Sequence, residues 1–174
     1  MHSLARTRPA GWHFNRPVDL GVLRQCGPLL LRLIVGYGFI VHGYAKLARG
    51  PETFAVVLHT LGVPLPHLFA WLTVLVELVG GIAILIGAFV PIVSLPMAAV
   101  LLTALFTIHL PYGFFSVKLV EVTENGTKFG PVGYEIILLY LASLAALALG
   151  GAGPISVDQW RLERRSDCNR RRGR

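Results

Sequence analysis

Residues 68–90 have the sequence LFAWLTVLVELVGGIAILIGAFV, and this stretch decides the fold. Apart from Glu77, every residue in it is apolar, Thr or Gly. An α-helix needs about 20 mainly apolar residues to cross the hydrocarbon core of a bilayer. The stretch is therefore predicted to be a membrane-spanning helix.

Three further segments have a similar length and polarity, at residues 29–45, 92–110 and 132–152. Pro96 in the third span removes one backbone hydrogen bond, so we expect that helix to bend without breaking. The second and third spans meet at Val90 and Pro91, a connection so short that the two helices must pack as antiparallel neighbours. The predicted fold class is all-α, an integral membrane four-helix bundle.

The composition of the whole chain agrees with a lipid environment. Of its 174 residues, 54% are hydrophobic and 14% are charged. Soluble domains carry about 25% charged residues, and a small one cannot bury a large apolar surplus. The low charge also excludes an intrinsically disordered chain. We expect one four-helix transmembrane domain at residues 29–155, with a basic tail at 1–28 and an Arg-rich tail at 156–174.

Basic residues are concentrated in these two tails, which indicates the orientation of the chain. Eleven Arg lie in the tails or beside the spans there: Arg6, Arg8, Arg16, Arg24, Arg161, Arg164, Arg165, Arg170, Arg171, Arg172 and Arg174. The loops on the other side hold only four basic residues: Lys46, Arg49, Lys118 and Lys128. Because loops rich in Lys and Arg stay in the cytoplasm, both termini are predicted to be cytoplasmic. Such tails favour anionic lipid headgroups, and the chain has no aromatic-interleaved basic surface for nucleic acid.

The two outer loops have distinct patterns. In the first, residues 52–61 place Phe54, Val57, Leu58 and Leu61 at helical spacing, which predicts a short interfacial helix with these four side chains toward the lipid. The second loop, residues 112–131, has turn-forming residues around Asn125 and Gly126 and is expected to form a hairpin or cap.

Ionisable residues within the spans indicate where function is expected. By helix rise, His42 lies about 20 Å above the inner end of the first span, and Glu77 about 14 Å below the outer end of the second. The two residues therefore share a depth, and we expect their side chains to face each other. Lys46 lies on the same helix face as His42. The candidate polar, proton-relay or headgroup site in the outer half comprises His42, Lys46, Glu77, His109 and Glu135.

Several interpretations of this cluster stay open. His42 and Glu77 are consistent with a structural pair that holds two helices in register, or with a proton relay or substrate-headgroup site. Metal binding has no supporting ligand spacing, and we expect no metal site. Arg32, about one turn from the cytoplasmic side, is expected to extend its side chain to the headgroups. Glycines expected to permit close helix packing are Gly36, Gly43, Gly80, Gly81 and Gly87.

No nucleophile elbow, phosphate-binding loop, haem-attachment or dinucleotide-binding motif occurs in the sequence. The chain is therefore expected to have no cofactor of its own, and whether it is an enzyme stays open.

The order of several short motifs resembles the DoxX family across residues 29–160. The first span ends in an HG-x-x-K-L pattern at His42 to Leu47, and the second contains E-x-x-G-G at Glu77 to Gly81. Further matching positions are the Gly-Val-Pro at 62–64, Gly87, His109, the Gly-Phe-Phe at 113–115, the Gly-Tyr-Glu at 133–135, and Gly151, Gly153, Ser156 and Asp158.

The resemblance implies a multi-pass protein of the bacterial inner (plasma) membrane, similar to the DoxD subunit of thiosulfate:quinone oxidoreductase. It favours a membrane scaffold or accessory partner of a redox or oxidative-stress system. The alternative is a quinone-linked oxidoreductase component in which the His and Glu residues form a headgroup site. A small-solute transporter is a further alternative. A homo-oligomer is compatible with each, and the substrate, electron donor and partner cannot be read from the sequence.

The predicted orientation can be tested with reporter fusions. Alkaline phosphatase, which is active only outside the cytoplasm, is expected to be inactive when joined after Trp160. An active fusion after Trp160 would contradict the four-span topology.

Overall fold

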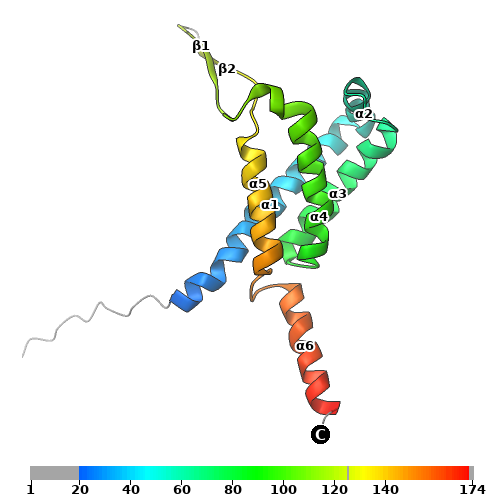
Figure 1. Cartoon of the computed structure of the whole chain (residues 1–174), viewed down its shortest axis with the longest axis vertical. Helices are drawn as coiled ribbons and strands as arrows, with labels where there is room; N and C mark the ends of the chain where they lie inside the picture. The colour runs from blue at the N-terminus through cyan, green and yellow to red at the C-terminus, as the bar shows by residue number, and fades with distance from the viewer. Residues whose placement is uncertain (1–19, 125, 173–174) are drawn as a thin grey trace, which may run out of the picture.

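The computed structural model describes residues 20–124 and 126–172, and most of them are helical (Figure 1). The α-helices are α1 (Leu20–Arg49), α2 (Pro51–Thr60), α3 (Pro66–Ile86), α4 (Val90–Ala104), α5 (Glu135–Gly150) and α6 (Val157–Arg172). A π-helical turn, η1 (Leu105–His109), and a 3-10 turn, η2 (Leu110–Tyr112), continue α4. The strands β1 (Leu119–Thr123) and β2 (Gly126–Phe129) form an antiparallel hairpin, as predicted for the second loop.

In the part of the chain that the structure describes, three helices are long and apolar enough to cross a membrane: Cys26–Arg49, Pro66–Ile86 and Val90–Tyr112. The third continues through Pro96 without a break. Helix α5 is apolar but has 16 residues, a length of about 24 Å at the usual helical rise. The fourth span of the predicted bundle therefore stays a prediction.

The four apolar helices contact one another in a closed sequence. Helix α1 packs against α3, α3 against α4, α4 against α5, and α5 against α1. Helix α2 and the β-hairpin lie at one end of these helices, and α6 extends from the other (Figure 1). We call these the α2 end and the α6 end.

Glycines bring the backbones of α1 and α3 together. A Cβ atom on Gly36 would lie 2.8 Å from the carbonyl oxygen of Gly81, and a Cβ on Gly81 would lie equally close to the oxygen of Gly36. Gly43 similarly faces the Cβ of Glu77, and Gly80 faces the side chain of Met97 in α4. Larger residues at these positions would separate the helices, so these glycines set the close packing.

The main hydrophobic core lies in the half of the molecule nearer to the α6 end. Its buried members are Val35, Phe39, Ile84, Val90, Met97, Leu144, Leu147 and Ala152. They come from α1, α3, α4, α5 and the residues just after α5. The helices are therefore packed together by apolar side chains at this end.

Arg32 lies in this packed half and is 3% exposed. Its guanidinium donates hydrogen bonds to four carbonyl oxygens: those of Ile84 (3.1 Å), Leu85 (2.7 Å), Ala152 (3.0 Å) and Ile155 (2.7 Å). The expectation that Arg32 extends to the headgroups was wrong. Carbonyls at a helix C-terminus have no partner within the helix, and at the end of α3 they attract the cation more strongly than the distant surface does.

Asp158 joins the start of α6 to the connection between α3 and α4. Its carboxylate accepts hydrogen bonds from the backbone N–H groups of Phe89 (2.8 Å) and Val90 (3.0 Å), and its own N–H donates to the oxygen of Gly87 (3.0 Å). A carboxylate at the N-terminus of α4 satisfies free N–H groups and matches the helix dipole. Arg32 and Asp158 thus connect the ends of α3, α4 and α5.

The connection between α3 and α4 begins three residues earlier than predicted. Gly87 ends α3 in the left-handed conformation (φ 69°), and α4 already starts at Val90. Pro91 lies in the first turn of α4, where the missing N–H is not needed. Apolar composition alone could not locate this turn, because its residues are as hydrophobic as the helices.

Helix α2 matches the predicted short helix, but its apolar side chains do not share one environment. Leu58 is buried with Ala55 and Ala70 of α3, whereas Val57 and Leu61 are exposed. The prediction of one lipid-facing surface was therefore wrong for Leu58, because α2 packs onto α3.

In the predicted tails, residues 1–19 lie outside the described part of the chain, and most of the C-terminal tail is the helix α6.

Replacement of Arg32 by Met should lower the free energy of unfolding by about 3 kcal/mol, because four buried or partly buried carbonyls lose a charged donor. Thermal unfolding in detergent would measure the loss. Arg165→Met on the exposed surface of α6 is the matched control and should change stability by less than about 0.5 kcal/mol. Equal effects of the two substitutions would contradict this role of Arg32.

Candidate functional site

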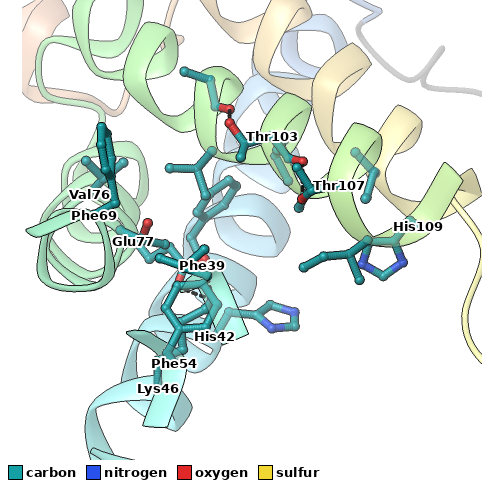
Figure 2. Close-up of a pocket in the computed structure, with 18 of the residues that line it drawn as sticks. Phe39, His42, Lys46, Phe54, Phe69, Val76, Glu77, Thr103, Thr107 and His109 are labelled. Carbon is teal, nitrogen blue, oxygen red and sulfur yellow. Dashed lines mark hydrogen bonds and ion pairs between the residues drawn. The ribbon is translucent and has the colours of Figure 1, made fainter. Parts of the chain in front are cut away.

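A cavity of about 790 Å³ lies among α1, α3, α4, α5 and their connections, nearer to the α2 end (Figure 2). Its volume is within the range of about 300–1,000 Å³ that is typical of small-molecule sites. Most of its lining is apolar. The polar side chains that line it are His42, Lys46, Thr73, Glu77, Thr103, Thr107, His109 and Tyr140.

The irregular end of the α4 helix forms one wall of the cavity. Thr103, Thr107 and His109 line it from α4 and the π-helical turn. Pro111 has no N–H with which to continue regular helical hydrogen bonding, and a π-helical turn precedes it. Such turns occur frequently at functional sites.

An ion pair between α1 and α3 lies at the edge of the cavity. The Lys46 ammonium is 2.6 Å from both carboxylate oxygens of Glu77, and the side chains are 23% and 7% exposed, respectively. The predicted contact between His42 and Glu77 was therefore wrong. Helix rise gave the depth of Glu77, but the long Lys46 stem reaches this depth from one turn further along α1.

His42 lines the cavity without a hydrogen-bond partner among residues 20–124 and 126–172. Its ring projects from α1 into the space between α1 and His109 in Figure 2. An imidazole can donate a hydrogen bond from one ring nitrogen and accept one at the other. His42 is therefore one of the groups in this site that are available to a ligand or to water.

His109 is more constrained. Its Nδ1 lies 2.9 Å from the carbonyl oxygen of Val132, in the segment that leads into α5. Because a carbonyl only accepts, Nδ1 must carry the hydrogen, which leaves Nε2 as the other polar atom of the ring. His109 thus connects the π-helical turn to α5 while it lines the cavity.

Glu135 does not line the cavity, unlike the other four predicted site residues. Its carboxylate accepts a hydrogen bond from the N–H of Ser116 (3.1 Å), and the Ser116 hydroxyl accepts one from the N–H of Ile136 (3.2 Å). These reciprocal contacts attach the second loop to the first turn of α5. The structure thus gives Glu135 a structural contact outside the cavity.

Sequence reasoning missed the aromatic and hydroxyl side chains of the site. Phe39, Phe54, Phe69 and Tyr140 contribute rings to the lining, and the Lys46 ammonium lies 5.2 Å from the centre of the Phe54 ring. Aromatic residues in apolar helices give no individual signal, because they are equally common in contact with lipid. No cluster of three or more His, Cys, Asp or Glu that could hold a metal ion occurs in the described part of the chain.

Comparisons with known proteins show what the chain is similar to. The DoxX family model matches residues 27–110, just under half of the chain. A protein named "Putative oxidoreductase CatD" from Bacillus subtilis is 34% identical over 90 residues, which are 52% of this chain and 65% of that protein. The chain thus matches just under two thirds of the length of CatD.

An uncharacterized protein from Haemophilus influenzae is 28% identical over 130 residues, which are 74% of this chain and 85% of that protein. No solved structure matches the chain.

Loss of either partner of the Lys46–Glu77 pair should destabilise the protein. Lys46→Met and Glu77→Gln should each cost about 3 kcal/mol, because each leaves a poorly solvated charge without its partner. The double variant should cost less than the sum of the two, as expected for residues in direct contact. Thermal unfolding would measure all three. His42→Ala is the control and should cost less than about 0.5 kcal/mol, whereas additive losses from Lys46 and Glu77 would contradict the pair.

Proposed function

We propose that this chain is a DoxX-family membrane component of a redox system and that its large cavity holds the headgroup of a quinone. The observation that supports this most is the apolar cavity of about 790 Å³ between membrane-capable helices, with a few polar groups at one side. Ligand sites of this kind are mainly apolar, with a small number of placed polar groups.

The residues that line the cavity fit a quinone. A quinone ring is flat and apolar, and its two carbonyl oxygens accept hydrogen bonds. His42 and Tyr140 both line the cavity, can donate a hydrogen bond and have no hydrogen-bond partner in the described part of the chain, and the Tyr140 hydroxyl lies beside Gly38 of α1. Phe39, Phe54 and Phe69 offer ring surfaces for stacking.

A bound quinone would supply the two-electron chemistry, and the chain would supply position and proton handling. The His42 imidazole can accept a proton at one ring nitrogen and release one from the other. The Lys46 ammonium is held by the Glu77 carboxylate, so the two opposite charges largely cancel beside the cavity. Electrons would come from a partner protein, and the chain would act as its accessory in the membrane. The name of the Bacillus subtilis relative, "Putative oxidoreductase CatD", supports a role in a redox system.

A scaffold without a ligand is the second candidate. The contacts Lys46–Glu77 and Glu135–Ser116 each connect two parts of the fold, as expected if the polar residues only stabilise a platform for a redox or stress-response partner. In both proposals the protein lies in a bacterial inner membrane with α6 in the cytoplasm. The large cavity would then lie in the outer half of the membrane.

Quinone binding can be tested with the whole chain in lipid nanodiscs. A short-chain ubiquinone or menaquinone at about a hundredfold excess over its Kd should stabilise the fold by about 2.7 kcal/mol. Ala99→Phe fills the cavity and should remove this stabilisation, whereas Ala146→Phe on α5, outside the lining, should retain it.

Each result distinguishes the candidates. A stabilisation that only Ala99→Phe abolishes supports the quinone site. No stabilisation by either quinone, and no quinone extracted with the purified protein, would contradict that site and favour the scaffold. Stabilisation that persists in Ala99→Phe would place the ligand outside this cavity and overturn the proposal.

A further inference from the structure

A second, smaller cavity of about 270 Å³ lies between the end of α1 and α2. It is lined by His42, Ala45, Lys46, Arg49, Gly50, Thr53, Phe54 and Val57. His42, Lys46 and Phe54 also line the large cavity. These three side chains therefore form a shared wall between the two cavities.

We propose that the small cavity is an access route for water and protons from the surface at the α2 end, and that His42 passes protons between it and the large cavity. The route is a property of this chain's own residues. The inference rests on the proposed quinone site in one respect only: a bound quinone would be the group that takes up or releases these protons.

The lining of the small cavity changes from the surface inward. Arg49 and Thr53 are exposed, Lys46 and Phe54 in the shared wall are half-buried, and His42 in the same wall keeps an exposed surface. The Thr53 hydroxyl bonds to the carbonyl of Arg49 (3.1 Å), which adds a polar group where α1 and α2 meet. Water needs such polar partners to occupy a cavity of this size.

The opposite end of the large cavity is packed with apolar side chains. The hydrophobic core lies there, and Phe39 belongs both to that core and to the cavity lining. All the buried members of the core are apolar, so they offer no partner to water or to a proton. Access from the α6 end would therefore require the packed core to open.

Of the three wall residues, His42 is the one suited to carry a proton. The Lys46 ammonium is fixed 2.6 Å from both oxygens of Glu77, and Phe54 has no ionisable group. His42 borders both cavities and has no competing partner among the described residues. Its ring can accept a proton at one nitrogen and release one from the other.

The charged groups around the small cavity are compatible with proton transfer through His42. Helix α1 contributes Lys46 and Arg49, and α3 contributes Glu77, which neutralises Lys46. Helix α2 places Thr53, Phe54 and Val57 in the lining and no ionisable side chain. Among the described residues that line this cavity, Arg49 therefore remains as a cation without an ion-pair partner, at the exposed mouth.

Chemical labelling of His42 tests the route without a quinone. Diethyl pyrocarbonate modifies accessible imidazoles, and mass spectrometry of the full chain in nanodiscs would give the rate at His42. Val57→Trp places a large ring in the small cavity and should slow labelling of His42 about tenfold, because a filled cavity excludes the reagent. Val56→Trp is the matched control, since Val56 is exposed on α2 and outside the lining. The control should leave the rate within about twofold of the native protein.

A second measurement with different labelling chemistry controls for effects that are specific to diethyl pyrocarbonate. In a chain with Cys26→Ser and Cys168→Ser, His42→Cys should react with a small cationic methanethiosulfonate, and Val57→Trp should again slow the reaction. The route is overturned if His42 is unreactive in both measurements, or if Val57→Trp and Val56→Trp act equally. It is also overturned if only Ala99→Phe slows labelling, since access would then run through the large cavity.

The two proposals fail in different ways. If quinone does not stabilise the protein but Val57→Trp selectively protects His42, the route stands and the quinone site falls. If quinone stabilises the protein while His42 cannot be labelled, the quinone site stands and the route falls.

Discussion

The hydrogen bonds of Arg32 are the constraint on which the arrangement of the helices depends. In a membrane, backbone carbonyls at the end of a helix need a partner, because lipid provides none. One guanidinium supplies that partner to the end of α3 and to the segment after α5. Asp158 supplies the complementary acceptor to the start of α4. Four helices are thereby held together at their α6 end.

This arrangement explains why the cavity lies toward the other end. The glycine contacts and the apolar core hold the helices closely near Arg32 and Asp158. Toward the α2 end, α4 becomes a π-helical turn, and α2 and the hairpin connect the helices instead of a continuous core. The space between the helices is consequently lined by side chains that do not fill it. The close packing at the α6 end and the cavity toward the α2 end therefore result from the same arrangement of helices.

Much of this fold follows from hydropathy and spacing, because long apolar segments must become helices in lipid. The three long helices, the short helix before α3 and the hairpin were all indicated by local sequence. The turn at Gly87 was not, because its residues are as apolar as the helices, and the environment of Arg32 was not, because it depends on residues far apart in the chain. Arg32 contacts groups 52 to 123 residues away, and no periodicity along the sequence encodes such a contact.

The candidate site illustrates the same limit at the level of single side chains. Helix rise placed His42, Lys46 and Glu77 near one depth, and all three line the cavity. Depth does not determine which side chains pair, because the length and direction of each side chain also matter. The Lys46 ammonium binds Glu77 and so leaves His42 without a competing partner in the described part of the chain. The ion pair that was not predicted is thus the feature that leaves His42 available, so one face of α1 carries both a structural contact and a candidate functional residue.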